Sequence, residues 1–362
     1  MRQFEYRRPR TVDEALALLA PHGAGTPDAG APTPVVPRGA AAQRATGDEV
    51  RPRPLRGVQP LAGGTDLVTL MKADVATPSH LVDVKRLADL PRGIQEAASG
   101  LNLGALTTLA EIEQSGAVRQ PYSALTEAAA LAATPQLRNM ATIGGNLLQR
   151  PRCWYFRHHL FQCWLKGGQD CPARDGENQF HALFGQGPCV AVHPSDPAAA
   201  LMALQAQVQL RGQRGERRVS MDELFALPEA DRRTETTLRE DELLLSIHLP
   251  PFPAGTRSTY LKAMDRKVWA FALVGVAAVL RCSGRRIEEA HLVLSGVAPI
   301  PWRAAGAERL LTGAEAGDEL FARAAEAAVA EATPLRRNGY KIPLARSLVR
   351  RALSSLATDV AA

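Results

Sequence analysis

The chain has 362 residues, 46% of them hydrophobic, and a formal net charge of +6 at pH 7. The length predicts two or three domains, and the hydrophobic content is sufficient for buried cores. The arginines are spread over the whole sequence without a basic stripe or interleaved aromatic residues, which argues against nucleic-acid binding, and no apolar run is long enough to span a membrane.

The N-terminus predicts a folded helix rather than an export signal. Residues 1–10 contain an arginine pair but no apolar core, and Thr11 and Glu14 form a capping-box pattern in front of the apolar residues 15–19. A secretion signal would need an apolar segment at this position. We therefore expect a cytoplasmic protein, or one that is exported to the periplasm together with a signal-bearing partner.

Residues 22–59 are predicted to be an exposed insertion without regular structure. This segment is rich in Pro, Gly, Ala and Arg, and its prolines disfavour both helix and strand. Ordered structure is expected to resume at Leu61.

Short strands and helices alternate beyond that point, up to a proline-rich linker. Capping patterns and apolar spacing predict strands at 80–84, 101–105, 208–210 and 243–249, and helices after Thr108, at 121–133, at 195–204 and after Ser220. Pro250, Pro251 and Pro253 predict a boundary between a domain at 1–250 and a second domain at 251–362.

The second domain is predicted to combine antiparallel strands with helices. Strands are expected at 260–264, 271–281 and 287–296, with a hairpin turn at Ser283-Gly284. Helices are expected at 302–311, 317–331 and 344–357. The predicted fold class of the chain is α+β.

Two pairs of adjacent glycines predict a cradle for phosphate groups. They lie in the segments 62–66 (Ala-Gly-Gly-Thr-Asp) and 142–147 (Thr-Ile-Gly-Gly-Asn-Leu). Adjacent glycines allow consecutive amide N–H groups to point into one concavity, which is a common way to bind an anion. Neither segment has the Rossmann or Walker A spacing, and each can also be an ordinary turn between a strand and a helix.

Four of the five cysteines lie between residues 153 and 189, in a segment that we call the cysteine window. Clustered thiols predict a soft metal centre or disulfides. The C-x-x-C spacing of zinc ribbons and ferredoxins is absent, so zinc and iron–sulfur remain open alternatives. The window is rich in aromatic residues, which would keep a redox cluster dry. The clustered cysteines are Cys153, Cys163, Cys171 and Cys189.

Lys262 follows Tyr260 and Leu261 on a strand that is predicted to be buried. A buried ammonium group needs an anionic or electron-rich partner, such as a flavin ring edge or a phosphate. The alternative is a solvated lysine on an edge strand. The sequence shows no Ser-His-Asp arrangement, no paired-carboxylate motif and no H-E-x-x-H pattern, so hydrolysis is not predicted.

In this order, the segments 4–6, 61–67, 142–147, 194–196 and 260–262 closely resemble the FAD-binding subunits of the molybdenum hydroxylase family. The resemblance covers the chain except for 22–59. It implies a two-subdomain FAD-binding domain of the vanillyl-alcohol-oxidase/PCMH type, followed by an α+β C-terminal domain. Segments 153–157 and 176–185 are most similar to flavin subunits of the periplasmic, three-subunit aldehyde oxidoreductase type.

The resemblance implies two cofactors, FAD and a 4Fe–4S cluster in an inserted loop at 150–190. Ala270 departs from the family pattern, because many relatives have an acidic residue at this position. The implied cluster ligands are Cys153, Cys163, Cys171 and Cys189. The implied FAD contacts are Leu61, Ala62, Gly63, Gly64, Thr65, Asp66, Leu67, Thr107, Thr108, Thr142, Ile143, Gly144, Gly145, Asn146, Asp196 and Lys262.

The resemblance also implies a function as an electron-transfer subunit without a catalytic residue of its own. A molybdenum-cofactor large subunit would oxidise an aldehyde, and electrons would pass through a 2Fe–2S small subunit and FAD to an external acceptor. Alternatives are the flavin subunit of a xanthine, carbon monoxide or aryl-CoA enzyme, a free-standing flavin oxidase, and a zinc-stapled scaffold. The sequence specifies neither the substrate nor the acceptor.

Overall fold

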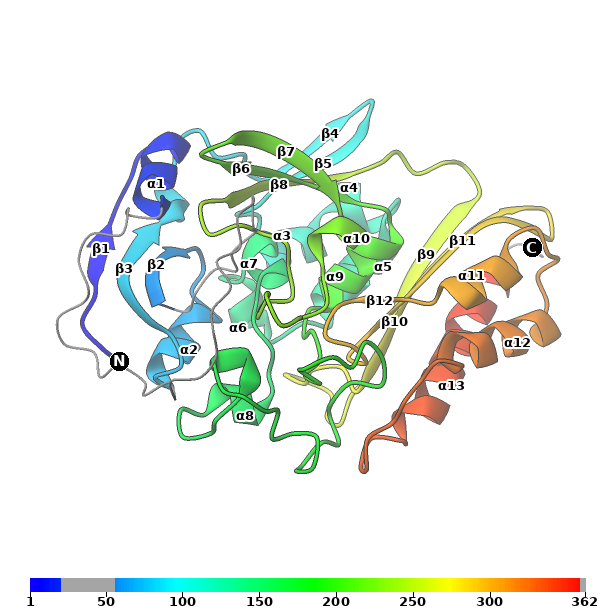
Figure 1. Cartoon of the computed structure of the whole chain (residues 1–362). Coiled ribbons are helices and arrows are strands. Elements are labelled where there is room, and N and C mark those ends of the chain that lie inside the picture. Colours follow the sequence, from blue (N-terminus) through cyan, green and yellow to red (C-terminus); the bar gives the residue numbers. More distant parts are fainter. Residues whose placement is uncertain (21–55, 359–362) are drawn as a thin grey trace.

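The structure, a computed structural model, describes residues 1–20 and 56–358 (Figure 1). Most of the predicted insertion, 22–55, therefore lies outside the described residues. Residues 56–59 belong to strand β2 (Arg56–Leu61), so the prediction that they lack regular structure is wrong. β2 is an edge strand, where Pro60 does not need to donate a hydrogen bond to a second neighbour.

The N-terminal layer is a three-stranded parallel sheet in the order β1-β3-β2. A helix begins after Thr11, whose side chain accepts a hydrogen bond from the Glu14 amide as the sequence predicts. The helix packs its apolar side into a small core with Val82 and Leu87. The remaining elements of this layer are β1 (Glu5–Arg7), α1 (Val12–Leu19), α2 (Leu67–Lys72), β3 (Thr77–Asp83) and the 3-10 helix η1 (Val84–Arg86).

The middle layer is a five-stranded antiparallel sheet in the order β4-β5-β8-β6-β7, with short helices packed on it. The sequence predicts its inner strands β5, β6 and β8 but not its edge strands β4 and β7, which are mostly polar and exposed. The strands are β4 (Ile94–Ala97), β5 (Gly100–Gly104), β6 (Gln207–Gly212), β7 (Gly215–Ser220) and β8 (Leu243–Leu249). The helices are α3 (Leu109–Gln114), α4 (Gly116–Arg119), α5 (Ser123–Ala130), α6 (Pro135–Arg138), α7 (Ile143–Leu147), α9 (Asp196–Ala203) and α10 (Met221–Leu224).

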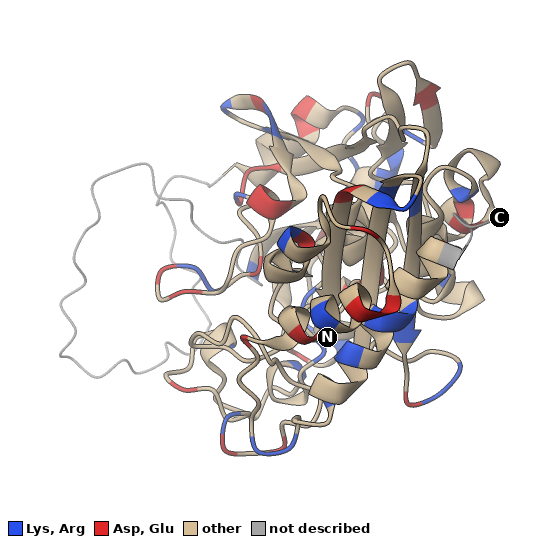
Figure 2. Cartoon of the chain, turned by 90° about the vertical axis from the view of Figure 1, so that its right-hand side faces the viewer, with Lys and Arg blue, Asp and Glu red and all other residues tan. Residues whose placement is uncertain are grey.

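The C-terminal layer is a four-stranded antiparallel sheet in the order β12-β11-β10-β9, covered on both faces. Alternate residues of β10 serve two cores: Val276 and Ala278 pack toward the C-terminal helices, whereas Ala277 and Val279 pack toward α5 and α9. Residues 274–280 accordingly carry no charge (Figure 2). The elements are β9 (Thr256–Ala263), β10 (Val274–Ser283), β11 (Arg286–Ser295), β12 (Trp302–Arg303), α11 (Ala305–Leu311), α12 (Asp318–Val329) and α13 (Lys341–Thr358).

The mixture of helices with a largely antiparallel sheet arrangement confirms the predicted α+β class. The cysteine window is mostly irregular chain at the lower edge of the view in Figure 1, and it contains α8 (Trp154–Arg157) and the 3-10 helix η2 (Trp164–Lys166). No helix in the described ranges is long and apolar enough to cross a membrane. The domain boundary at 250/251 stays a prediction.

Candidate functional site

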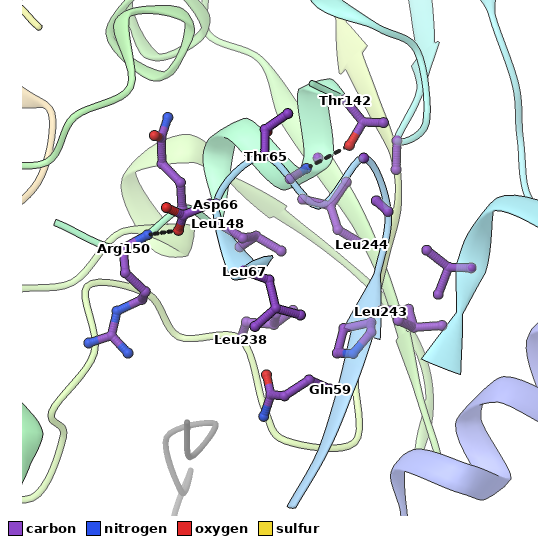
Figure 3. A pocket seen from close by; sticks show the side chains of 18 of the residues that line it. Gln59, Thr65, Asp66, Leu67, Thr142, Leu148, Arg150, Leu238, Leu243 and Leu244 are labelled. Atoms are coloured by element: carbon purple, nitrogen blue, oxygen red, sulfur yellow. Dashed lines mark hydrogen bonds between the residues drawn. The ribbon is translucent and has the colours of Figure 1, made fainter. Parts of the chain in front are cut away.

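The two glycine segments line one cavity of about 210 Å³, which we call the glycine cleft (Figure 3). One wall comes from the turn between β2 and α2, and the other comes from the start of α7. The predicted residues that line it are Ala62, Gly63, Gly64, Thr65, Asp66, Leu67, Thr142, Gly144 and Gly145.

The two turns contact each other directly at Gly63. A Cβ atom on Gly63 would lie 1.7 Å from the carbonyl oxygen of Met140, so only glycine fits there without a movement of the backbone. The neighbouring Gly64 has φ +72°, the left-handed region that other residues rarely adopt. Both glycines of the first turn are therefore required by the backbone geometry.

The amide groups of the two turns differ in their hydrogen bonding. In the second turn, Ile143 N donates to Thr107 O at 2.8 Å, Gly144 N to Ala105 O at 2.9 Å, and Gly145 N to the Thr142 hydroxyl at 3.2 Å. Among the described residues, the N–H groups of Gly63–Thr65 have no hydrogen-bond acceptor. Unpaired amides at the edge of a cavity are suited to an anion, so the first turn is better suited than the second to hold a phosphate.

The carboxylate of Asp66 is already occupied by the chain that leads into the cysteine window. Its oxygens accept from the Arg150 amide at 2.9 Å (Figure 3), and lie 2.9 Å from Arg152 Nη1 and 2.7 Å from Arg157 Nη2. Burial lowers the pKa of Arg152 to about 10, although the Asp66 charge opposes this. The arginines neutralise a carboxylate that would otherwise repel a phosphate in the cleft.

Other predicted FAD contacts lie behind the walls of the cleft. Ile143 is fully buried, and Thr107 donates to the carbonyl oxygen of Gly93 at 2.9 Å. Thr108 caps α3 through a capping box, and Asn146 accepts a hydrogen bond from the Ser195 hydroxyl. These four residues, together with Leu61 at the end of β2, are not among the residues that line the cleft.

Asp196 and Lys262 form a buried ion pair with each other. Lys262 Nζ lies 2.7 Å from Asp196 Oδ2 and donates to the Leu131 carbonyl at 2.9 Å, and the Tyr260 hydroxyl donates to Asp196 Oδ1 at 2.6 Å. The Lys262 side chain is 1% exposed. β9 is an edge strand, but this lysine is not solvated, and its anionic partner is Asp196 of this chain. Asp196 raises the pKa of Tyr260, after burial as the larger cause.

A second cavity of about 210 Å³, which we call the aromatic pocket, lies between the cysteine window and the β9–β10 loop. His193 lines both cavities. Its Nε2 atom has no hydrogen-bond partner, and burial lowers its pKa to about 3. The side chains that shape the pocket include Arg152, Trp154, Phe180, His181, Asp196 and Phe271.

Each of the four thiols of the cysteine window interacts electrostatically with at least one other thiol, and none of them forms a disulfide. Cys189 donates to the Cys171 sulfur and lowers the pKa of Cys171 to about 6. Burial raises the pKa of Cys153 to about 12, and the charges of Cys163 and Cys171 raise it further. His181 Nε2 lies 3.2 Å from Cys153 Sγ. The described chain contains no group of three or more His, Cys, Asp or Glu side chains that could hold a single metal ion.

Comparison with known proteins identifies the family. Residues 50–252 match the FAD binding domain in molybdopterin dehydrogenase, and residues 259–356 match the CO dehydrogenase flavoprotein C-terminal domain. The chain belongs to the FAD-binding medium subunits of the molybdenum hydroxylase family. The family resemblance stated from the sequence is thereby confirmed, and the protein is an oxidoreductase subunit.

Individual relatives agree with this assignment. The chain is 37% identical over 303 residues to the aldehyde oxidoreductase FAD-binding subunit PaoB of Escherichia coli (strain K12), covering 82% of this chain and 91% of the relative. It is 30% identical over 358 residues to the carbon monoxide dehydrogenase medium chain of Hydrogenophaga pseudoflava, covering 98% and 96%. A chain in a solved structure of carbon monoxide dehydrogenase from the same organism superimposes with a TM-score of 0.70 at 29% identity, covering 98% of this chain and 97% of that chain.

No sequence motif predicts one part of the cleft of this medium subunit. Four residues that carry no motif and lie far from the glycine segments in the sequence also line the cleft, namely Thr234, Glu235, Thr236 and Leu238. The buried Glu235 pairs with Arg150 at 3.0 Å, and burial raises the pKa of Glu235. A signal for the Asp66 contacts did exist, because Arg150, Arg152 and Arg157 surround Cys153 in the sequence.

Proposed function

We propose that this medium subunit binds FAD along the glycine cleft and the aromatic pocket, and transfers electrons within a molybdenum-dependent aldehyde oxidoreductase. The observation that carries the proposal is the set of unpaired amides at Gly63–Thr65, held against the second glycine turn. When bound, FAD supplies electron-accepting and electron-donating chemistry, and the chain positions it.

The walls of the two cavities suit the parts of a flavin dinucleotide. The amides of Gly63–Thr65 would hold the diphosphate. Leucine side chains, among them Leu106 and Leu243, give the cleft apolar lining, which suits a base. His193 lines both cavities, so FAD would extend past His193 from the cleft into the aromatic pocket beside Asp196. The flavin ring would occupy this pocket.

We infer that the cysteine window holds a 4Fe–4S cluster on Cys153, Cys163, Cys171 and Cys189. Buried thiols with raised pKa values are costly to ionise unless a metal centre neutralises them. The thiols lie within electrostatic reach of each other, and no disulfide joins them. An iron–sulfur cluster is larger than a single ion, so its ligands need not converge as closely as those of zinc.

The aldehyde substrate and the partner subunits are proposed from the relatives rather than from a site in this chain. The relative PaoB is named as an aldehyde oxidoreductase subunit. We assign to the complex a molybdenum-cofactor large subunit, a 2Fe–2S small subunit and an external electron acceptor. Export to the periplasm would require a signal-bearing partner, and cytoplasmic assembly is the alternative. None of the residues described above is assigned an acid or base role on the aldehyde.

The experiment is spectroscopic and elemental analysis of the purified complex and of the purified subunit. We expect visible flavin bands, about one FAD and four irons in this subunit, and aldehyde oxidation only by the complete complex. Zinc without iron and flavin would favour the scaffold alternative. Turnover of xanthine, carbon monoxide or an aryl-CoA compound in preference to aldehydes would assign the complex to another branch of the family.

A further inference from the structure

Arg152 lies at the junction of the glycine cleft and the aromatic pocket. It lines the aromatic pocket, and its side chain contacts two residues that line the cleft. Nη1 lies 2.9 Å from Asp66 Oδ1, and Nη2 donates to Gln149 Oε1 at 2.7 Å. On the pocket side, the guanidinium carbon lies 5.0 Å from the centroid of the Phe271 ring. One cation therefore lies next to both cavities.

The three arginines around Asp66 differ in how far the chain itself uses their donors. Arg150 pairs with Glu235 at 3.0 Å, and Arg157 donates to four oxygen atoms of the chain. The Arg152 side chain is 25% exposed, against 13% for Arg150 and 16% for Arg157. A guanidinium group has five N–H donors, and the described contacts of Arg152 use Nη1 and Nη2 once each. Arg152 therefore keeps donors for a ligand.

The charges of this arginine cluster do not balance. In the described part of the chain, the ion pairs of the three arginines involve two carboxylates, those of Asp66 and Glu235. Burial raises the pKa of Glu235, which weakens the negative side further. Burial also lowers the pKa of Arg152 to about 10, and the charge of Arg157 acts in the same direction. A partly buried cation needs a compensating anion, so the cluster favours a negatively charged ligand.

We propose that Arg152 donates hydrogen bonds to the phosphate group of FAD on the flavin side of the diphosphate. The Gly63–Thr65 amides and this guanidinium group then hold the diphosphate from two sides, and Asp66, the next residue in the chain, fixes the guanidinium beside the amides. This inference rests on the proposed function, because it requires FAD in the glycine cleft. It does not depend on a metal centre in the cysteine window.

Two substitutions separate the charge of Arg152 from its shape. Arg152→Gln removes the positive charge but keeps a polar side chain. Arg152→Lys keeps the charge but loses the planar group that can bind two oxygen atoms at once. Arg174→Gln is the matched control, because it changes the net charge by the same amount at an exposed position of the cysteine window that lines neither cavity.

The measurement is the affinity of the FAD-free, full-length subunit for ADP and for AMP, by isothermal titration calorimetry. ADP contains both phosphates of the dinucleotide without the flavin, and AMP lacks the phosphate on the flavin side. We expect Arg152→Gln to weaken ADP binding at least roughly tenfold, and Arg152→Lys roughly threefold. AMP binding should change less than about twofold in both variants. Arg174→Gln should change neither affinity.

Equal ADP affinity in wild type and Arg152→Gln would overturn the proposal. An equal loss of ADP and AMP binding would also overturn it, because that result indicates a general distortion of the cleft. If Arg152→Gln does not fold, the ratio of the ADP and AMP affinities in Arg152→Lys decides, and a ratio equal to that of wild type would overturn the proposal. A wild-type subunit that binds neither FAD nor ADP would instead disprove the proposed function, so the two failures are distinguishable before any variant is compared.

Discussion

The glycine cleft and the cysteine window are neighbours in the fold, but they are built in different ways. The first cleft turn is shaped by the backbone of a few consecutive residues, with Gly63 against the Met140 carbonyl and unpaired amides beside it. The window is shaped by side chains from distant positions, such as Cys153 and Cys189, in mostly irregular chain. A local sequence motif therefore predicts the cleft. The thiols of the window, in contrast, come close to one another only through the tertiary fold.

Asp66 connects the two regions. It belongs to the first glycine turn, yet its carboxylate contacts Arg150, Arg152 and Arg157 at the entrance of the window. If the regions are functionally separate, a substitution in one region should leave the cofactor content of the other unchanged. If Asp66 couples them, one substitution should affect both. The following variants distinguish these outcomes.

Gly63→Ala should have the largest effect, and it should be confined to the cleft. The added Cβ would meet the Met140 carbonyl oxygen at 1.7 Å, so the two turns must separate. Overpacking of this kind costs about 1–3 kcal/mol, and we expect FAD affinity to fall at least roughly tenfold. FAD retention after gel filtration measures this. Gly116→Ala is the control, because nothing lies within 4 Å of its Cβ position. Unchanged FAD binding in Gly63→Ala would contradict a role of the turn contact.

Cys171→Ser should affect the window and spare the cleft. Cys171 is the thiol with the lowered pKa, about 6, so it is the most readily ionised ligand of the proposed cluster. We expect loss of most of the iron while the FAD content stays within about twofold of wild type. Elemental analysis measures the iron content, and flavin absorbance measures the FAD content. Cys282→Ser is the control, because Cys282 lies in β10 outside the window, and the iron content of this variant should equal that of wild type. Full iron retention in Cys171→Ser would show that the proposed ligand set is wrong.

Asp66→Asn tests whether the two regions are coupled. The substitution leaves Arg152 and Arg157 without their carboxylate partner. Because water still reaches this ion pair, its loss should lower the free energy of unfolding by about 1–2 kcal/mol. Hydrogen exchange at 150–157 should become roughly tenfold faster. Asp74→Asn is the control, since its pair with Arg2 is exposed. Equal exchange rates in wild type and Asp66→Asn would mean that the Asp66 contacts do not stabilise residues 150–157.

The sequence predicts the parts of this molecule that depend on local pattern. Apolar alternation and capping identify the inner strands and most helices, and the glycine pairs identify both cleft turns. The sequence does not predict the edge strands β4 and β7, because the polar residues typical of sheet edges interrupt the alternation of apolar and polar residues. The Asp196–Lys262 pair is also not predicted, because the family resemblance implies a separate cofactor contact for each residue. Their mutual contact depends on packing between α9 and β9, which no local pattern reports.

His193, which lines both the cleft and the aromatic pocket, should make the stability of the subunit depend on pH. Burial lowers its pKa from 6.5 to about 3 in the folded chain, so the folded state binds fewer protons than the unfolded state between these values. The free energy of unfolding should therefore be highest above pH 6.5 and fall as the pH decreases toward 3. The His193 contribution amounts to about 2 kcal/mol between pH 6.5 and 5. Urea titrations of the subunit at these pH values measure the slope. His193→Phe should flatten it, whereas His159→Phe, at an exposed position, should not. If stability depends on pH to the same extent in all three proteins, His193 is not a buried, neutral histidine between the two cavities.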